Sequence, residues 1–332
     1  MKRQAKKGSP RIRTFWKVLG IFIVSALICF ATYGIYLAKQ AENAMNNSYE
    51  TDERNGSDKR DEKVTPIEDN VSILFIGIDD SEGRGQGAEN SRSDALILAT
   101  LNVETKTIKT LSIPRDSYVY IPYKNRKDKI THAHAYGGTL ATIETVEELL
   151  DIPVDYYVRM NFDAFIDVVD ALGGITAEVP YDVLELDEHE NFSVNLKKGT
   201  QKLNGSEALA LARTRKQDND IERGKRQQEI LKAIAVQAAK PTSILKYDDV
   251  LDAVSDNMKT NMTFSEMKSF LNYLSNGAPR IDSVYLAGSD DMSTGIYYYQ
   301  LEDESLNDAK SILKRHLGLE PEQSISTNSS NN

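Results

Sequence analysis

Cysteine is nearly absent from this chain. The 332 residues contain one, Cys29, and it lies in a long apolar stretch. The rest of the chain can therefore form neither a disulfide nor a thiolate metal site, which excludes a zinc ribbon and a thiol enzyme. Histidine is also scarce. Of the four in the chain, His132 and His134 lie two residues apart with no third ligand nearby, so we expect no histidine metal site.

Basic charge is scarce outside the first 17 residues. Those residues hold seven Lys and Arg and no acid, whereas the remaining 315 hold 33 Lys and Arg against 50 Asp and Glu, a formal charge of −17. A nucleic-acid-binding domain has a net basic footprint. The excess of acid therefore argues against nucleic acid as a partner, and against adhesion of this part to an anionic lipid surface.

One long apolar run is present. Residues 18–38 carry no charge, and 21 residues are enough for a helix to cross a bilayer. Aromatic residues lie near both ends, and the basic residues before the run predict that the N-terminus is inside the cell. A cleaved signal peptide would have a shorter apolar core. We therefore expect an uncleaved signal-anchor and a single-pass type II protein of the cell membrane.

The chain divides by composition into five parts. A basic cytoplasmic tail at 1–17 and the membrane span at 18–38 precede a polar, charged stretch at 39–69, which predicts an extracellular stalk. The folded domain is expected at 70–318, and a low-complexity polar tail at 319–332.

Strand and helix patterns alternate within the expected domain. Residues 71–78 (VSILFIGI) form a short apolar run typical of a strand buried on both faces. Strand-like runs at 94–103 and 107–113 are separated by three residues, the spacing of a hairpin. Further patterns follow, as helices at 139–150, 162–174, 205–213 and 222–240 and as strands at 175–180 and around 297–299. This order predicts an α/β or α+β domain with a central mixed sheet flanked by helices.

Two carboxylates are expected to lie close together. Asp79 follows the strand at 71–78, and Asp94 begins the next strand. Two carboxylates on neighbouring strands suit Mg²⁺, which takes oxygen ligands from carboxylates, phosphates and water. The alternative is structural: Asp79 caps a loop, and Arg92 pairs with Asp94 at the surface. The glycine-rich GRGQG at 83–87 lacks the end of a phosphate-binding P-loop and is interpreted as a lid.

Cationic residues gather in two places. Arg115 and Asp116 follow a strand that Pro114 ends, and loops after strands are where α/β sheets bind ligands. The alternative is a solvated turn. Arg213 and Arg215 would share one face if the segment were extended, and could then hold one anion together.

The helix that follows carries a stripe of four residues at helical spacing: Arg223, Gln227, Ile230 and Ile234. Its apolar members face the core, so its first turn should point Arg223 and Gln227 inward. A buried arginine needs an anionic partner. Internal pairing with nearby Asp218 and Asp220 would satisfy it, and so would a phosphate or pyrophosphate ligand.

These features occur together in nine short motifs: IGID at 76–79, RSD at 92–94, SIPRD at 112–116, DKI at 128–130, ALGGI at 171–175, LNG at 203–205, AL at 208–209, RTR at 213–215 and RGKRQ at 223–227. The set resembles the LytR-CpsA-Psr family over roughly residues 70–240, behind a short tail and one membrane span as in that family. It is most similar to members that attach wall teichoic acid in Gram-positive bacteria.

The resemblance implies a phosphotransferase. Such an enzyme moves an anionic glycopolymer from an undecaprenyl-pyrophosphate carrier to the 6-hydroxyl of N-acetylmuramic acid in peptidoglycan, forming a phosphodiester. It implies Mg²⁺, with Mn²⁺ as an alternative, at Asp79 and Asp94, and an apolar tunnel for the polyprenyl tail. The pyrophosphate would be surrounded by Arg92, Arg115, Lys129, Arg213, Arg215, Arg223 and Gln227.

Phosphoryl transfer depends on positioning and charge neutralisation more than on a covalent nucleophile. Arg115 would supply electrostatic stabilisation, and Asp116 or Asp220 would deprotonate the acceptor hydroxyl. Two of these assignments have a neighbouring alternative. Asp80 could bind the metal in place of Asp79, and Gln228 could contact the pyrophosphate in place of Gln227. The inward stripe favours Gln227. Two other functions stay open, a polyprenyl-pyrophosphate phosphatase and a non-catalytic polyprenyl-phosphate-binding regulator of the envelope.

Overall fold

The computed structural model describes residues 39, 48–50, 56–60, 62–66, 68–79, 91–185, 194–214, 219–240, 242–243, 257–263, 265–267, 269–270 and 279–320. All of these except Lys39 belong to one compact unit that spans residues 44–332. The expected membrane span at 18–38, the expected lid at 83–87, Asp80, Arg215 and Asp218 lie outside the described residues. Among the helices that are described, none combines the length and the apolar character needed to cross a membrane.

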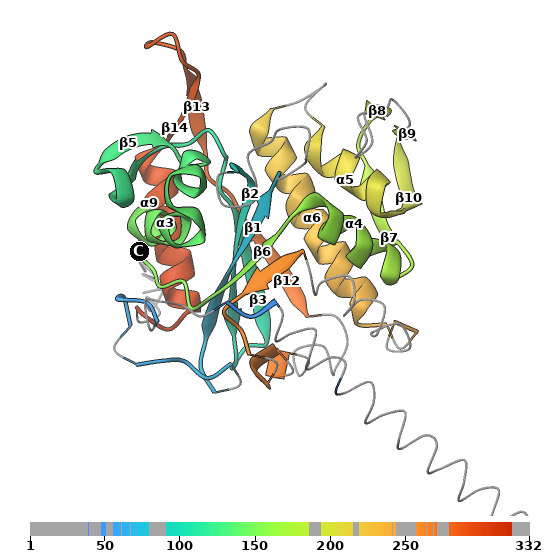
Figure 1. Cartoon of the computed structure of the whole chain (residues 1–332), viewed down its shortest axis with the longest axis horizontal. Coiled ribbons are helices and arrows are strands. Elements are labelled where there is room, and N and C mark those ends of the chain that lie inside the picture. Colours follow the sequence, from blue (N-terminus) through green and yellow to red (C-terminus); the bar gives the residue numbers. More distant parts are fainter. Residues whose placement is uncertain are drawn as a thin grey trace, which may run out of the picture. The chain divides into compact units, whose positions relative to one another are not determined.

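A six-stranded mixed sheet runs through the centre of the unit (Figure 1). Its strands, in spatial order, are β11 (Met258–Thr260), β6 (Tyr156–Met160), β1 (Val71–Ile78), β2 (Ser93–Asn102), β3 (Thr107–Ser112) and β12 (Arg280–Val284). β1 pairs antiparallel with β2 and parallel with β6, and it is buried along its length as its continuous apolar sequence predicts. β2 and β3 form the predicted hairpin, with Asn102 opposite Thr107.

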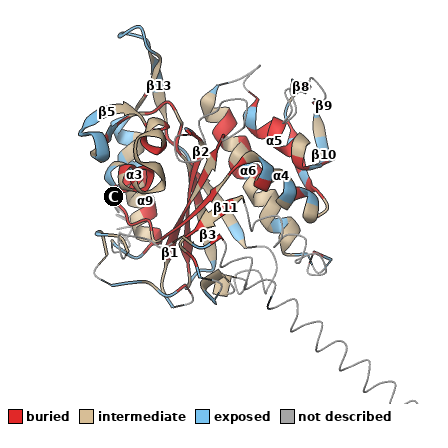
Figure 2. Ribbon diagram, in the orientation of Figure 1, coloured by how far each residue is buried: buried red, intermediate tan, exposed pale blue. Residues whose placement is uncertain are grey.

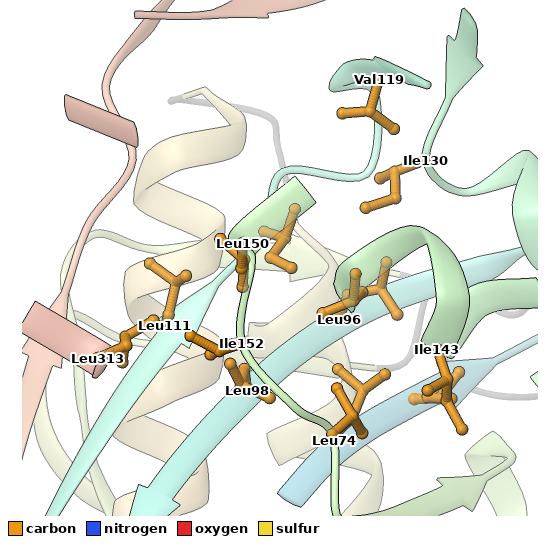
Figure 3. Close-up of a cluster of buried hydrophobic side chains, with 14 of the residues drawn as sticks. Leu74, Leu96, Leu98, Leu111, Val119, Ile130, Ile143, Leu150, Ile152 and Leu313 are labelled. Carbon is orange, nitrogen blue, oxygen red and sulfur yellow. The ribbon is translucent and has the colours of Figure 1, made fainter. Parts of the chain in front are cut away.

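One face of the sheet is covered by α3 (His132–Leu150) and α9 (Asp303–His316) (Figure 1). Because side chains alternate along a strand, Leu74 and Ile76 of β1 share this face. They form one buried cluster with Ile143 of α3 and Leu313 of α9 (Figure 3). Figure 2 shows the same core as buried strands between two layers of half-buried helices.

The opposite face is covered by α4 (Phe162–Ala171), α5 (Gly205–Arg213) and α6 (Asp220–Ala238) (Figure 1). Each helix begins after an asparagine whose side chain accepts a hydrogen bond from a backbone N–H of the first turn: Asn161, Asn204 and Asn219. Such caps satisfy donors that the first turn of a helix cannot satisfy itself. Four short strands pack with these helices: β7 (Ile175–Val179), β8 (Val183–Glu185), β9 (Val194–Leu196) and β10 (Gly199–Leu203).

Two hairpins complete the described fold. β4 (Tyr118–Ile121) and β5 (Arg126–Lys129) are joined by the short 3-10 helix η2 (Pro122–Lys124). β13 (Gly288–Asp291) and β14 (Tyr298–Leu301) form an arm that projects past the end of the sheet (Figure 1). The predicted α/β class, with a central mixed sheet flanked by helices, is confirmed.

The expected stalk at 39–69 needs one correction. Ser57 donates a hydrogen bond to Glu147 at 2.6 Å, and Lys59 pairs with Asp151 at 2.7 Å, both on or just after α3. Arg60 pairs with Asp155 at 2.7 Å. These residues are part of the folded domain, which therefore begins before residue 70. Polar composition predicted a separate stalk because many of the interactions of this segment involve charged side chains, and its packed Val64 is too isolated to give an apolar periodicity.

Candidate functional site

A cavity of about 410 Å³ lies between the sheet and the helices α4, α5 and α6. Most of its walls are apolar: Phe75, Ile76, Gly77, Ala95, Ile97, Met160, Phe162, Phe165, Val168, Leu209, Ala212, Ile230, Leu231 and Ile234. A cavity with this lining suits a ligand with an aliphatic part, because apolar surface gains free energy on leaving water.

The stripe predicted on residues 223–234 is confirmed. Arg223, Gln227, Ile230 and Ile234 of α6 all line the cavity, in that order along the helix. Arg223 is 5% exposed. The helix therefore presents a charged and polar turn followed by an apolar one to the same space, as its spacing requires.

A β-bulge turns Asp94 toward the cavity. Gly77 of β1 pairs with Ala95 and Ile78 pairs with Ser93, so Asp94 is the extra residue of β2 with no Cα partner on β1. A bulge of this kind re-aims a side chain. Asp94 lines the cavity and forms an ion pair with the guanidinium of Arg115, which lines it as well. The alternative pairing of Asp94 with Arg92 is not the one observed.

Asp116 connects two cations at the edge of the cavity. It is 4% exposed, and its Oδ1 lies 2.8 Å from Lys129 Nζ while its Oδ2 lies 3.6 Å from Arg115 Nε. That Nε is buried and has no hydrogen-bond partner among the described residues. A buried donor that is left unused is costly unless a ligand engages it. Arg115 and Asp116 therefore do not form the solvated turn that was the alternative interpretation.

The second cationic group comes from α5 and α6. Arg223 Nη2 lies 3.0 Å from Asp220 Oδ1, so the predicted internal pairing occurs for Asp220. Arg213 lines the cavity, with its guanidinium 4.6 Å from the ring centroid of Phe162. Arg213 is the last residue of α5, and the backbone of Thr214, its C-cap, is extended. The face shared by residues 213 and 215 stays a prediction, because Arg215 lies outside the described residues.

The two neighbouring glutamines point to different places. Gln227 lines the cavity and donates to Ala212 O at 3.3 Å. Gln228 is buried against the sheet and donates to carbonyls of β3 and β12 at 3.4 and 3.3 Å. Arg226 is also turned away from the cavity, because it donates to Leu211 O and Thr214 O at the end of α5. Its contribution is to cap that helix.

Of the described residues expected around a pyrophosphate, two do not line the cavity. Lys129 is joined to it through Asp116, whereas Arg92 is exposed and is not brought together with the others. Sequence reasoning also missed Asn161, the N-cap of α4, which adds a polar group to the wall. The asparagine before an apolar helical run was the available signal for that cap.

Asp79, the other carboxylate expected to bind a metal, is buried and is not among the residues that line the cavity. It follows β1 directly after Ile78, which pairs with Ser93, and it is 5% exposed. Asp79 is therefore one residue beyond Ile78 on β1, and Asp94 is the residue after Ser93 on β2. Two carboxylates so placed suit an ion that also takes phosphate oxygens and water as ligands. No group of three or more His, Cys, Asp or Glu that could hold a metal occurs in the described part of the chain.

The fold and the cavity define a class of protein. An α/β domain holds an apolar chamber that ends in arginines and carboxylates, so it suits a ligand with an aliphatic tail and an anionic head.

Comparison with known proteins agrees with this class. A model of the LytR_cpsA_psr family matches residues 35–315. The polyisoprenyl-teichoic acid–peptidoglycan teichoic acid transferase TagT of Bacillus subtilis (strain 168) is 39% identical over 319 residues, which cover 95% of this chain and 98% of that protein. The chain belongs to the LytR-CpsA-Psr family, as its motifs predicted.

Two solved structures show the same fold. TagT bound to LIIa-WTA has a TM-score of 0.71 at 40% identity and covers 81% of this chain and 99% of that one. The LytR-CPS2A-psr family protein YwtF (TagT) with bound octaprenyl pyrophosphate lipid has a TM-score of 0.66 at 37% identity, with coverage of 81% and 99%.

Proposed function

We propose that this protein is a polyisoprenyl-teichoic acid–peptidoglycan teichoic acid transferase. The observation that carries the proposal is the apolar cavity that ends at Arg115, Arg213 and Arg223. A polyprenyl tail would occupy the apolar part, and the pyrophosphate would lie against the arginines. A relative of known structure is described with octaprenyl pyrophosphate bound, and another relative is named as such a transferase.

The reaction proposed is transfer of a phosphoryl-linked glycopolymer. The 6-hydroxyl oxygen of N-acetylmuramic acid in peptidoglycan attacks the phosphorus that bears the glycopolymer. The bond from that phosphorus to the bridging oxygen breaks, and polyprenyl phosphate leaves with the electron pair. The hydroxyl proton passes to a carboxylate. Charge that develops on the phosphate oxygens is stabilised by guanidinium groups already in place.

The arginines are held ready by carboxylates. Asp94 and Asp116 contact Arg115, and Asp220 contacts Arg223. These pairs fix the guanidinium planes before substrate binds, which lowers the cost of ordering them. Lys129, Arg215 and Gln227 complete the proposed pyrophosphate site, and Arg92 is a further proposed contact. Asp116 or Asp220 is the proposed proton acceptor.

Asp79 and Asp94 are the residues proposed to hold Mg²⁺, with Mn²⁺ as an alternative. Such an ion would neutralise charge on the phosphate oxygens. Residues 18–38 are proposed to anchor the protein in the cell membrane as a single-pass type II protein, with residues 1–17 inside and the domain outside. The anchor would keep the site near a carrier that is itself in the membrane.

The proposal is tested with the full chain in detergent micelles. The chain is mixed with polyprenyl-pyrophosphate-linked glycan, soluble peptidoglycan oligomers and Mg²⁺, and the products are identified by mass spectrometry. Arg115→Ala is run beside it, with Arg280→Ala as the matched control. Arg280 also pairs with a carboxylate on a strand, at 3.0 Å from Asp282, but lies away from the cavity.

A phosphodiester-linked product that disappears in Arg115→Ala and with chelator, but persists in Arg280→Ala, would support the transferase. Free glycan phosphate without linkage to peptidoglycan would indicate a phosphatase instead. Bound but unchanged lipid would indicate a carrier-binding protein. Either of the last two results would overturn the proposed function.

A further inference from the structure

A group of tyrosines and a lysine faces outward beside the cavity. On the hairpin β4–β5, Val119 and Ile121 are buried, so Tyr118 and Tyr120 point the other way. Lys127 lies opposite Tyr120 in the register, on the same outward side. Tyr298 of β14 adds a third ring, 4.6 Å from that of Tyr118 between centroids. We call these four residues the tyrosine face.

The tyrosine face is fixed relative to the cavity edge. The backbone N–H of Tyr299 donates to Asp116 O at 2.9 Å, and Ser117 forms a β-bridge with Tyr299. The projecting β13–β14 hairpin is therefore joined by its backbone to the loop that carries Asp116. Residues far apart in the sequence thus form one rigid surface.

A short chain of contacts leads from the tyrosine face to the cavity. Lys129 Nζ lies 5.8 Å from the ring centroid of Tyr298 and 5.6 Å from that of Tyr297. The same Nζ contacts Asp116, which contacts Arg115 in the cavity wall. The face is therefore three contacts away from Arg115 in the cavity wall and in direct contact with Lys129.

Tyr297 lies next to the tyrosine face in the sequence and close to Lys129. Burial, a hydrogen bond to Asp290 at 2.9 Å and the negative charges of Asp290, Asp220 and Asp116 raise the pKa of its hydroxyl. Asp220 belongs to α6 and Asp116 to the loop after β3. Asp116 and Asp220 are the two proposed proton acceptors.

The β4–β5 hairpin, which carries three of the four residues of the tyrosine face, is basic in an acidic chain. The segment KNRKDK at 124–129 has four cations and one acid, whereas the chain beyond residue 17 has a formal charge of −17. Lys127 Nζ also lies 5.8 Å from the ring of Tyr118. Aromatic rings offer a flat apolar surface to the C–H face of a sugar, and a nearby lysine attracts a carboxylate. The face therefore suits an acidic carbohydrate.

Reaction geometry decides which carbohydrate this is. The attacking and leaving oxygens of phosphoryl transfer are roughly in line, on opposite sides of the phosphorus. If the leaving polyprenyl phosphate lies in the cavity, the attacking hydroxyl must approach from the other side of Arg115, where the tyrosine face is. We infer that the tyrosine face binds the acceptor, a peptidoglycan glycan strand with its stem-peptide carboxylates; this deepens the proposed function and rests on it.

Direct binding tests the inference without any donor lipid. Soluble glycan chains of alternating N-acetylglucosamine and N-acetylmuramic acid, with and without stem peptides, are titrated into the full chain in micelles. Tyr118→Leu should weaken binding about tenfold, because a ring that stacks on a sugar is lost. Tyr285→Leu is the matched control: this tyrosine is also exposed and beside a lysine, with Lys225 Nζ 5.4 Å from its ring, but lies outside the face.

Lys127→Gln is a second variant that does not depend on the aromatic packing. It should weaken binding of both kinds of chain about threefold, because stem peptides carry carboxylates and a peptide-free N-acetylmuramic acid carries the carboxylate of its lactyl group. Thermal unfolding of each variant shows whether it is folded. If Tyr118→Leu does not fold, the result from Lys127→Gln decides.

The inference would be overturned by no binding by the unchanged chain, by equal weakening in Tyr285→Leu, or by binding that neither Tyr118→Leu nor Lys127→Gln affects. A stronger effect of Tyr118→Leu on binding of the free anionic glycopolymer would assign the face to the donor and also overturn it. Acceptor binding that is lost in the variants while no transfer occurs in any assay would leave the inference standing and contradict the proposed transferase.

Discussion

Gly224 of α6 lies against Ser112 at the end of β3. A Cβ atom on Gly224 would come within 2.7 Å of Ser112 Oγ, closer than real Cβ contacts, and within 3.1 Å of its Cβ, which is tighter than most. The absence of a side chain therefore lets the first turns of α6 sit directly on the sheet. Those turns carry Arg223 and Gln227 into the cavity wall.

Gly224→Ala should displace α6 from β3. It should lower the kcat/KM of transfer by more than its loss of unfolding free energy alone would explain. Overpacking of this kind costs about 1–3 kcal/mol, and a small shift of Arg223 reduces its contact with the phosphate. The measurement is kcat/KM together with the free energy of unfolding in urea. Ser112→Ala removes the nearer clashing atom, so the double variant should recover part of the activity. Activity equal to the unchanged chain in Gly224→Ala would contradict this account of how α6 is positioned.

Asp94→Asn should reduce transfer about a hundredfold and raise the Mg²⁺ concentration needed for half-maximal rate. The substitution keeps the shape of the side chain but removes the charge that orients Arg115 and that is proposed to bind the ion. Initial rates are measured over a series of Mg²⁺ concentrations. Asp282→Asn is the control, because Asp282 also pairs with an arginine on a strand. A lower rate with an unchanged Mg²⁺ dependence would mean that Asp94 acts on Arg115 alone.

The stripe on α6 was predictable because helical spacing alone places residues 223, 227, 230 and 234 on one side. The pair of Lys129 and Asp116 was not, since they lie 13 positions apart in the sequence and only the folding of the β4–β5 hairpin, which ends at Lys129, brings them to 2.8 Å. The hydrogen bond from the backbone N–H of Tyr299 to Asp116 O was not predictable either, because these two residues lie far apart in the sequence. Sequence periodicity predicts which side of a single helix or strand is buried. This part of the site depends instead on contacts between elements that are distant in the sequence.

The start of the domain shows the same limit for charged residues. The carboxylate of Asp151 accepts hydrogen bonds from Lys314 and Lys59, and these two lysines lower its pKa to about 2. One carboxylate thus joins a segment before the sheet to the last helix. Nothing in the local sequence around Lys59 distinguishes it from a solvated lysine.

Ala95→Leu should prevent lipid binding and leave the fold intact. Ala95 is in β2, and its side chain faces the cavity across from α6. A leucine there extends into the empty space, so it competes with an aliphatic ligand without displacing the core. Binding of octaprenyl pyrophosphate should weaken at least tenfold, and the unfolding temperature should change little. Val236→Leu, on the exposed side of α6, is the control. Unchanged lipid binding in Ala95→Leu would place the lipid elsewhere.

Stability should fall on mild acidification because of His316 at the end of α9. Burial lowers its pKa from 6.5 to about 4, with a smaller effect of the nearby charge of Lys109. Its Nδ1 lies 2.7 Å from Thr100 Oγ1 and its Nε2 lies 2.9 Å from Thr107 Oγ1. The neutral ring therefore joins α9 to both strands of the hairpin, β2 and β3.

The sign of the effect follows from proton binding. Between pH 6.5 and about 4 the unfolded chain protonates this histidine and the folded chain does not. The contribution of His316 is therefore complete above pH 6.5, falls as the pH drops, and is lost near pH 4, with a slope of at most about 1.4 kcal/mol per pH unit. The free energy of unfolding in urea is measured from pH 7.5 to 4.5 for the unchanged chain and for His316→Gln. The variant should be less stable at pH 7.5, because it loses the paired hydroxyl contacts, and the difference between the two should shrink as the pH falls. A difference that stays constant over this range would show that His316 is not held neutral in the folded protein.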